Sequence, residues 1–259
     1  MSNELHFIAI IPARYASTRF PGKPLAMLGG KTVIEHVYRQ ARQALTDVAV
    51  ATDDSRIFDC VRAFGGEAVM TRNDHPCGTN RCFEAYQTLR GDVRPNDVVI
   101  NIQGDEPFIR PEQIKLLMSC FPTDIATLVK PFTEEDGQDA LHNPNSPKVV
   151  VGDGRALYFS RSVIPYLRGI DESAWLAESV RRGTPFYKHI GLYAYSAPVL
   201  RDIVRLPESP LEKAESLEQL RWLEAGYTIR VAQTNIQTIG IDTPDDLLRA
   251  EEALTATIR

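Results

Sequence analysis

The sequence has few cysteines, no excess of positive charge and no long apolar run. Cys60, Cys77, Cys82 and Cys120 lack CxxC spacing, which argues against a zinc site or a disulfide framework and favours a reducing, cytoplasmic setting. The 29 Lys and Arg stand against 34 Asp and Glu, a net charge of -5, so no nucleic-acid partner is expected. The first apolar run, Phe7–Ile11, is far too short to cross a membrane and follows no basic leader, so no membrane partner is expected.

Two common nucleotide-binding motifs are also missing. Residues 30–32, Gly-Lys-Thr, resemble the end of a phosphate-binding P-loop, but the position that requires its first glycine is occupied by Leu25. No GxGxxG sequence follows the first apolar run, which disfavours a dinucleotide-binding Rossmann enzyme. We therefore interpret residues 30–32 as a turn and a helix cap.

Apolar runs of strand length alternate with helix-length periodic segments through the first half of the sequence. This alternation is typical of a parallel sheet wound with helices and predicts an α/β fold. The predicted strands are Phe7–Ile11, Val48–Ala51, Glu67–Met70, Val98–Ile102 and Ile125–Val129. The predicted helices are Thr32–Gln43, Ser55–Phe64, Asn80–Leu89 and Pro111–Cys120.

The second half of the sequence breaks this alternation. Two short runs, Lys148–Val151 and Ala156–Ser160, flank Asp153-Gly154 and predict a β-hairpin inserted into the α/β body. The further predicted elements are a strand at His189–Tyr195, a helix at Leu211–Ala225 capped by Ser209, strands at Ile229–Ala232 and Thr238–Ile241, and a final helix from Thr243 through Ala253. No linker or internal repeat is evident, so residues 1–259 are predicted to form a single domain.

A long loop after the first predicted strand carries three cations. Arg14, Arg19 and Lys23 lie in a segment stiffened by proline and glycine, at the sheet edge where open α/β sheets bind ligands. Three cations so placed suit a triphosphate, whose charge must be neutralised before a nucleophile can approach. The alternative is a solvated basic loop.

Two carboxylates each come directly after a predicted strand, although they are far apart in the sequence. Asp105 and Asp242 could share a magnesium ion, which takes one or two protein carboxylates together with phosphate oxygens and water. The alternative for Asp105 is that it caps the helix that begins near Pro111. The nearby Asp245 and Asp246 fall in the first turn of the final helix, where carboxylates complement the helix dipole.

Other polar residues have two interpretations each. The loop at residues 74–81, which ends at Arg81, could bind an anion or form a plain capped turn. His189 and Tyr193 share one face of a predicted strand, which could be a polar substrate wall or a half-buried aromatic face. Glu218 is a solvated carboxylate unless its helix face borders a pocket.

A set of longer motifs resembles a known family. The motifs are Pro-Ala-Arg-Tyr-Ala-Ser-Thr-Arg-x-Pro-Gly-Lys-Pro, Thr-Asp-Asp, Met-Thr-Arg-x-Asp-His, Gln-Gly-Asp-Glu-Pro, Ala-Leu-Tyr-Phe-Ser-Arg, Ser-Pro-Leu-Glu and Asp-Thr-Pro-x-Asp-Leu. They occur in this order from Ile10 to Leu247, and together they closely resemble the 3-deoxy-manno-octulosonate cytidylyltransferase (CMP-KDO synthetase) family.

The resemblance implies a Rossmann-like nucleotidyltransferase fold, three layers α/β/α around a mostly parallel sheet. It also implies an inserted β-hairpin region, about residues 140–200, that serves dimerisation and part of the sugar site. The implied reaction transfers CMP from CTP to the anomeric hydroxyl of 3-deoxy-D-manno-octulosonate (KDO), releasing pyrophosphate and giving CMP-KDO. The implied setting is a magnesium-dependent cytoplasmic homodimer that supplies lipopolysaccharide synthesis in a Gram-negative bacterium.

Matching the motifs position by position implies roles for individual residues. The residues expected to hold the nucleotide are Arg14, Arg19, Lys23, Thr71, Arg72 and Gln103. The residues expected to bind magnesium are Asp105 and Asp242. The residues expected to line the sugar pocket are Arg81, His189, Tyr193, Glu218 and Gln219. The implied catalytic set is Arg14, Arg19, Lys23, Asp105 and Asp242.

One position departs from the family pattern. Asn80 stands where the family usually has a glutamate beside the sugar site, so altered contacts with the sugar hydroxyls are expected. The rival substrates are other acidic sugars, such as 8-amino-KDO or sialic acid. A rival of another class is a non-catalytic nucleotide sensor, which would bind CTP without releasing pyrophosphate.

Overall fold

Strands and helices alternate through the first 118 residues in the computed structural model, which describes residues 4–258. The chain divides into two units, each assembled from separate segments. Unit 1 contains residues 4–118, 192–204 and 237–258, and unit 2 contains residues 119–191 and 205–236. Each unit is described by itself below.

The sheet of unit 1 contains the parallel strands that the alternation predicts. Its strand order is β5 (Ala68–Met70), β4 (Val48–Thr52), β1 (His6–Ala13) and β6 (Asp97–Asn101), with every neighbouring pair parallel. The C-terminal residues of β10 (Tyr187–Ser196) add an antiparallel strand beside β6. Every residue of β4 and of β6 is buried, as is usual for parallel strands that are covered on both faces.

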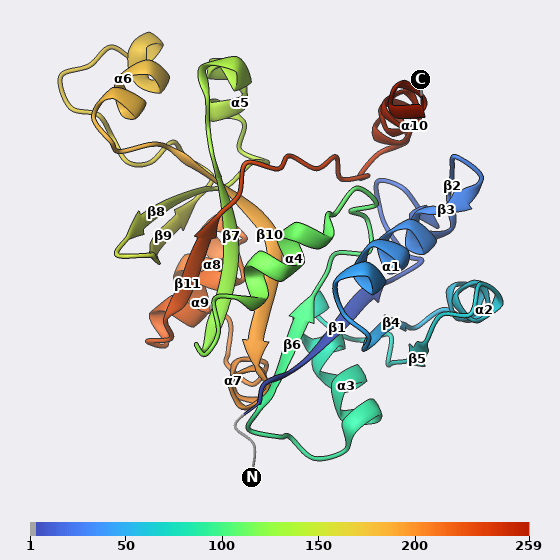
Figure 1. The fold of residues 1–259 in the computed structure, drawn as a ribbon. Helices are drawn as coiled ribbons and strands as arrows, with labels where there is room; N and C mark the ends of the chain where they lie inside the picture. Colours follow the sequence, from blue (N-terminus) through green and yellow to red (C-terminus); the bar gives the residue numbers. More distant parts are fainter. Residues whose placement is uncertain (1–3, 259) are drawn as a thin grey trace. The chain divides into compact units, whose positions relative to one another are not determined.

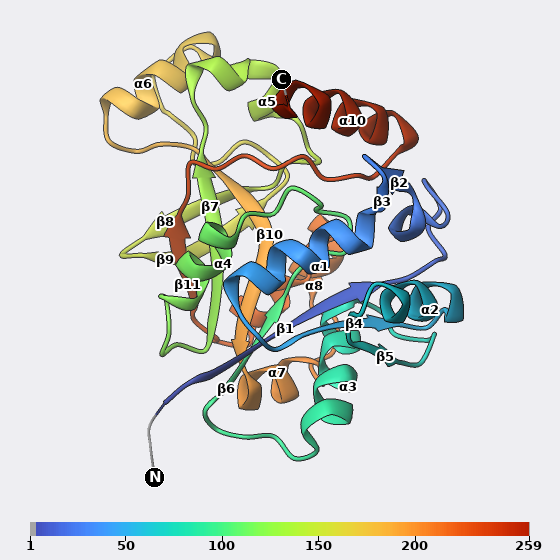
Figure 2. The same ribbon diagram turned by 45° about the vertical axis from the view of Figure 1, so that its right-hand side comes forward.

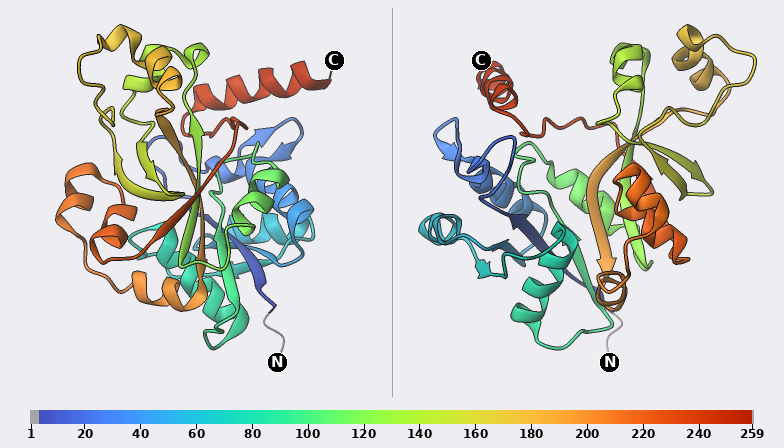
Figure 3. Two further views of the ribbon diagram at one scale, coloured as in Figure 1. Left: turned by 60° about the vertical axis from the view of Figure 1, so that its left-hand side comes forward. Right: turned by 180° about the vertical axis from the view of Figure 1, so that it is seen from behind.

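Helices cover both faces of this sheet. They are α1 (Val33–Ala44), α2 (Ser55–Ala63), α3 (Gly78–Arg90), α4 (Pro111–Met118) and α7 (Ala197–Ile203). The last helix, α10 (Pro244–Ile258), packs through Ala250 against Leu28 and Val33 rather than on this sheet. Figure 1 shows α1 and α4 on one face, and Figure 3 shows α3 and α7 together on the other. The Thr32 side chain caps α1 by accepting a hydrogen bond from the Glu35 amide, as the sequence predicts. A short hairpin of β2 (Met27–Leu28) and β3 (Lys31–Thr32), preceded by a 3-10 turn at Lys23–Leu25, comes before α1.

Unit 2 contains a second group of strands. β7 (Ile125–Pro131) pairs in parallel with β11 (Ile229–Gln233), which is followed by β9 (Arg155–Ser160) and β8 (Lys148–Gly152). β8 and β9 form the predicted hairpin, and its turn residues Asp153 and Gly154 both have positive φ, 52° and 66°.

The helices of unit 2 are α5 (Gly137–His142), α6 (Trp175–Arg181), α8 (Pro210–Glu215) and α9 (Gln219–Glu224), with 3-10 turns at Glu134–Asp136 and Glu172–Ala174. Figure 2 shows α5 and α6 side by side. Leu141 of α5 and Trp175 of α6 share an apolar cluster with Phe132 and Phe186. Within residues 4–258, no helix combines the length and the apolar character that crossing a bilayer requires.

The single helix predicted at Leu211–Ala225 is wrong, because the chain forms two helices there, α8 and α9. Ser216 lies between them in the left-handed region, at φ 51°. Contacts from a distant segment stabilise the break. The Arg161 guanidinium donates to the carbonyl oxygens of Glu215 and Ser216, at 2.6 and 3.2 Å, and the Glu215 carboxylate accepts from Ser160 Oγ at 2.6 Å.

The strand predicted at Thr238–Ile241 is also wrong. These residues form no ladder, although the Ile241 amide donates to the Asp105 carbonyl oxygen at 2.8 Å. The helices α5, α6 and α7 have no counterpart among the predicted elements. The remaining predicted strands and helices are present, with ends that differ by a few residues.

The left-handed conformation of Ser216 generates a stability prediction. A β-branched side chain is strained there, whereas glycine is not. We expect Ser216→Val to lower the free energy of unfolding by about 1–2 kcal/mol and Ser216→Gly to leave it unchanged or slightly higher. Denaturant unfolding of both variants measures the difference, and equal stabilities would contradict it.

Candidate active site

A cavity of about 280 Å³ opens in unit 1 where the parallel strands end. Three segments line it: residues between 12 and 24, from the end of β1 and the loop after it; residues between 75 and 81, from the loop before α3 and its first turn; and residues 103–105 after β6. Asp242, which precedes α10, completes the lining. Polar loops therefore meet beyond the carboxyl ends of the strands of unit 1, which is where ligands bind in open α/β sheets.

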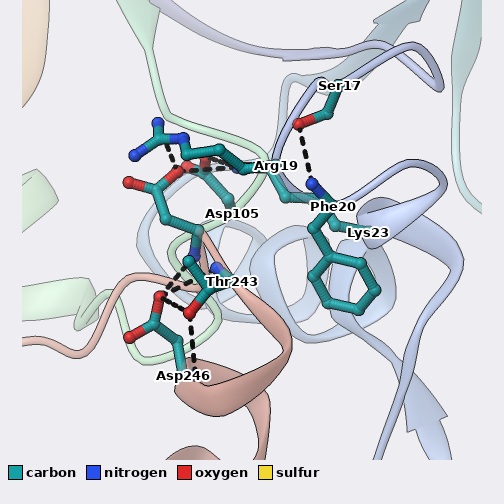
Figure 4. Close-up of polar contacts among 8 residues, drawn as sticks. Ser17, Arg19, Phe20, Lys23, Asp105, Thr243 and Asp246 are labelled. Atoms are coloured by element: carbon teal, nitrogen blue, oxygen red, sulfur yellow. Dashed lines mark hydrogen bonds and ion pairs between the residues drawn. The ribbon is translucent and has the colours of Figure 1, made fainter.

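Asp105 and Asp242, 137 positions apart in the sequence, converge on Lys23. Figure 4 shows Arg19, Lys23 and Asp105 close together. The Lys23 ammonium forms a short ion pair with Asp105 Oδ2 and lies 3.1 Å from Asp242 Oδ1. Arg19 reaches the same Asp242 oxygen at 3.1 Å. The Lys23 side chain is only 14% exposed, whereas that of Arg19 is 62% exposed, so the lysine pair is the better shielded from water and salt.

This pair of carboxylates fits a hard divalent cation. Both carboxylates lie within reach of one ammonium group, so a cation placed there can contact both Asp105 and Asp242. Mg²⁺ takes one or two protein carboxylates and completes its shell with phosphate oxygens and water. No group of three or more His, Cys, Asp or Glu gathers at one point within residues 4–258, and a magnesium site that uses substrate phosphates does not need one.

Close backbone packing places Asp105. A Cβ on Gly104 would lie 2.8 Å from the Pro12 carbonyl oxygen, so only glycine lets the strand-end loops approach this closely. The Asp105 carbonyl oxygen in turn accepts the Ile241 amide at 2.8 Å, next to Asp242. The segments that carry the two carboxylates are therefore joined through their backbones.

Asp246 fixes the other side of Asp242. Its Oδ2 accepts hydrogen bonds from the Asp242 amide at 3.0 Å and from the amide and hydroxyl of Thr243, both at 2.8 Å. Burial acts to raise the pKa of Asp246, but bonds from Thr243, Arg249 and the Asp242 amide outweigh it and lower the pKa from 3.8 to about 2. The sequence predicted only a dipole role for this carboxylate.

The basic loop is held in a defined conformation. Gly22, at φ 73°, donates its amide to the Tyr15 carbonyl oxygen at 2.9 Å and packs against the Tyr15 ring. The Arg56 guanidinium carbon lies 3.4 Å from the centroid of the same ring, and Asp54 pairs with Arg56 at 2.6 Å. Arg14 lines the cavity and is exposed. The contacts of Tyr15 with Gly22 and Arg56 therefore fix the backbone of the loop that carries the cations.

Arg81 lies deep in the cavity wall and is 5% exposed. Its guanidinium donates to Thr71 Oγ1 at 2.6 Å and pairs with Asp53 Oδ2 at 3.3 Å. A buried guanidinium requires such partners because desolvating an unpaired charge is costly. Asp53 was missed as a functional candidate, and its position in the Thr-Asp-Asp motif directly after β4 was the available signal.

The other predicted nucleotide residues are placed differently. Gln103 lines the cavity. Thr71 and Arg72 do not line it. Thr71 acts as the partner of Arg81, while Arg72 is exposed and its side chain lies 3.4 Å from Asp74. Any contact of these two residues with nucleotide stays a prediction.

The predicted sugar residues other than Arg81 lie on β10, on α9 and at Glu218, the residue before α9. Tyr193, in unit 1, is 6% exposed, and its ring stacks on that of Tyr195 with the centroids 5.9 Å apart. Glu218, in unit 2, accepts from Arg221 at 3.3 Å. The adjacent Gln219 is buried. Their roles toward a sugar stay predictions.

His189, also in unit 2, is partly buried. Its Nε2 lies 3.3 Å from Thr127 Oγ1, and the Phe159 ring packs edge-on with the centroids 5.2 Å apart. Desolvation lowers the pKa of His189 from 6.5 to about 4. The ring is therefore neutral at physiological pH and suited to hydrogen bonding rather than to charge pairing.

Asn80 has a structural contact rather than a place in the cavity lining. Its Nδ2 donates to the Val204 carbonyl oxygen at the end of α7, at 3.2 Å, and its Oδ1 accepts from Cys77 Sγ at 2.8 Å. A glutamate carboxylate could not donate the first of these bonds. The departure from the family pattern is thus matched by a contact with α7.

Known proteins have sequences similar to this one over almost its whole length. A cytidylyltransferase family matches residues 8–231. The 3-deoxy-manno-octulosonate cytidylyltransferase of Phocaeicola vulgatus is 59% identical over 254 residues, which cover 96% of this chain and 98% of that protein. The chain belongs to the 3-deoxy-manno-octulosonate cytidylyltransferase family. The member from Thermodesulfovibrio yellowstonii is 46% identical over 256 residues.

Solved structures support the same family and its fold. CMP:2-keto-3-deoxy-manno-octonic acid synthetase, solved in complex with CTP, has a TM-score of 0.85 and 41% identity, and the match covers 98% of this chain and 100% of that one. The 4-diphosphocytidyl-2C-methyl-D-erythritol synthase of Anaerococcus prevotii has a TM-score of 0.58 and 14% identity over 98% of this chain and 100% of that one, and shows the fold alone. The cytidylyltransferase is thus an enzyme with a nucleotidyltransferase-type α/β fold.

The close approach at Gly104 generates a prediction with a matched control. A Cβ on Gly78, which also lies against Pro12, would be 3.4 Å from the nearest atom, an ordinary contact. We expect Gly104→Ala to lower the free energy of unfolding by about 1–3 kcal/mol because the backbone must shift, and Gly78→Ala to change it little. Thermal and denaturant unfolding check this, and similar stabilities for both variants would contradict it.

The depressed pKa of His189 predicts a pH dependence of stability. Between pH 6.5 and about 4 the unfolded chain binds a proton at this residue and the folded protein does not. The free energy of unfolding therefore falls as the pH is lowered through this window, by up to about 3 kcal/mol for this residue. The measurement is the difference in pH slope between the parent protein and His189→Gln, in which this titration is removed; identical slopes would show that the ring titrates normally.

Proposed function

We propose that this protein transfers CMP from CTP to the anomeric hydroxyl of KDO, releasing pyrophosphate and giving CMP-KDO for lipopolysaccharide biosynthesis. Cytidylyltransferases of that name are 58–59% identical to this chain over 96% of its length, and this similarity supports the substrate pair. The observation on which the chemistry depends is the convergence of Asp105 and Asp242 on Lys23, beside a loop with two further cations.

The reaction is an in-line attack of the sugar hydroxyl on the α-phosphorus, with pyrophosphate as the leaving group and no covalent enzyme intermediate. Such a transfer needs positioning and charge stabilisation rather than a nucleophilic side chain. Arg14, Arg19 and Lys23 neutralise the triphosphate and the departing pyrophosphate. The side chain of Gln103, in the loop after β6, holds the nucleotide, and Thr71 and Arg72 assist from the segment after β5.

Asp105 and Asp242 would hold Mg²⁺, which would supply positive charge to offset the charge of the triphosphate and of the departing pyrophosphate. Their mutual repulsion is balanced by Lys23 in the arrangement observed. We propose that Lys23 exchanges these carboxylates for phosphate oxygens as the substrate binds.

The sugar is proposed to be recognised by charge and by hydrogen bonds. Arg81, anchored by Asp53 and Thr71, presents a fixed guanidinium to the KDO carboxylate. His189 in its neutral form bonds sugar hydroxyls, together with the side chains of Tyr193, Glu218 and Gln219. We further propose that residues 1–259 act as one domain, that the segment at about residues 140–200 pairs two copies into a homodimer, and that the enzyme works in the cytoplasm.

Replacing Asp105 tests the catalytic assignment. We expect Asp105→Asn to reduce turnover at least about 100-fold while leaving the fold intact, because a neutral amide binds Mg²⁺ poorly and cannot compensate its charge. Asp59→Asn, an exposed change on α2, is the matched control and should retain full activity. The assay is pyrophosphate release from CTP, Mg²⁺ and KDO, with the product mass measured.

Near-normal pyrophosphate release by Asp105→Asn at saturating Mg²⁺ would refute the metal role of this residue. A failure of the parent protein to give the mass of CMP-KDO would refute the substrate assignment. Competition between KDO, 8-amino-KDO and sialic acid in the same assay identifies the preferred sugar.

A further inference from the structure

The Asp246 carboxylate is directed at Thr243 (Figure 4), and it also accepts the backbone amide of Asp242. One oxygen, Oδ2, accepts the Asp242 amide at 3.0 Å and the Thr243 amide at 2.8 Å. The Thr243 hydroxyl also donates to this oxygen at 2.8 Å and accepts the Asp246 amide at 3.3 Å. The result is a reciprocal cap at the start of α10 that extends one residue beyond the cap position.

This extension has a geometric effect on Asp242. The amide of Asp242 belongs to the peptide plane before its Cα, and the amide of Thr243 belongs to the plane after it. Because a single oxygen holds both planes, both backbone dihedrals of Asp242 are restrained, and only the side-chain torsions stay adjustable. The direction of the Asp242 Cα–Cβ bond, from which its carboxylate extends, is therefore set by Asp246.

The chain just before Asp242 is held as well. The Ile241 amide donates to the Asp105 carbonyl oxygen at 2.8 Å. A Cβ on Gly240 would lie 2.9 Å from Glu106 Oε1, so this residue packs directly against the loop after β6. The Asp105 loop restrains one side of Asp242, and Asp246 restrains the other.

We propose that Asp246 is a positioning residue for the divalent-cation site, acting through the backbone of Asp242. The proposal rests on the proposed function, in which Asp242 and Asp105 share Mg²⁺. Mg²⁺ demands near-ideal ligand geometry, so a carboxylate on a loosened backbone binds it less well. A simple helix cap would contribute to stability alone.

The structure offers a matched control one residue away. Asp245 carries the same charge in the same helical turn but is exposed, and the bonds to the Asp242 and Thr243 amides belong to Asp246. Removing Asp245 therefore changes the charge at the start of α10 without releasing Asp242.

The experiment measures Mn²⁺ binding to the CTP-bound protein by electron paramagnetic resonance, without KDO and well below the melting temperature. We expect Asp246→Ala to raise the Kd for Mn²⁺ about tenfold or more. Asp246→Glu should stay within about twofold of the parent, because glutamate makes the same bonds in a capping box. Asp245→Ala should also stay within about twofold, since it makes none of these bonds.

An Asp246→Ala variant that melts at a lower temperature but binds Mn²⁺ with the parent Kd would overturn the proposal, because Asp246 would then act only as a helix cap. If this variant does not fold, Asp246→Asn takes its place. A neutral oxygen is the weaker acceptor, so the Kd should rise at least about threefold, and an unchanged Kd would again overturn the proposal.

Asp242→Ala separates this failure from a failure of the proposed function. If Asp242→Ala binds Mn²⁺ as the parent does, the metal role of Asp242 itself is wrong. If Asp242→Ala loses Mn²⁺ binding while Asp246→Ala keeps it, only the positioning role is wrong.

Discussion

A single ammonium group, that of Lys23, lies between two carboxylates from distant parts of the sequence. Two carboxylates this close to one ammonium group would repel each other without a cation. Three local features hold Asp105 and Asp242 near each other. A glycine permits the approach at residue 104, a backbone bond joins the two segments, and a helix cap fixes the second carboxylate. A cation-dependent phosphoryl transfer is the chemistry that such an arrangement suits, since charge compensation is what the reaction requires.

The parts of the fold that sequence reasoning found are those encoded locally. Short runs rich in β-branched residues, such as Val98–Ile102, favour buried strands, and a capped start such as Thr32 to Glu35 marks a helix within a few residues. The strand-end rule then predicted where polar residues would gather. For that reason Lys23 and Asp105 could be named together from the sequence, although their roles stay predictions. Asp242 was named through a strand at Thr238–Ile241 that does not form, and it is the Ile241–Asp105 backbone bond that joins its segment to the site.

The features that sequence reasoning missed depend on partners far away along the chain. The periodic pattern at Leu211–Ala225 is helical throughout. Arg161 nevertheless donates to the carbonyl oxygens of Glu215 and Ser216 and stabilises a break in the helix that the local sequence does not predict. The same applies to Asp53, which is an ordinary loop acidic residue until Arg81 is seen beside it. Thr238–Ile241 has the composition of a strand, but it joins no ladder.

Unit 1 is complete only when residues 237–258 pack with residues 4–118. Its cavity brings Asp242 to residues of the loop after β1, more than 200 positions earlier in the sequence. Contacts between residues so far apart along the chain close large loops and are made late in folding. The two carboxylates therefore come together only when most of unit 1 is already folded.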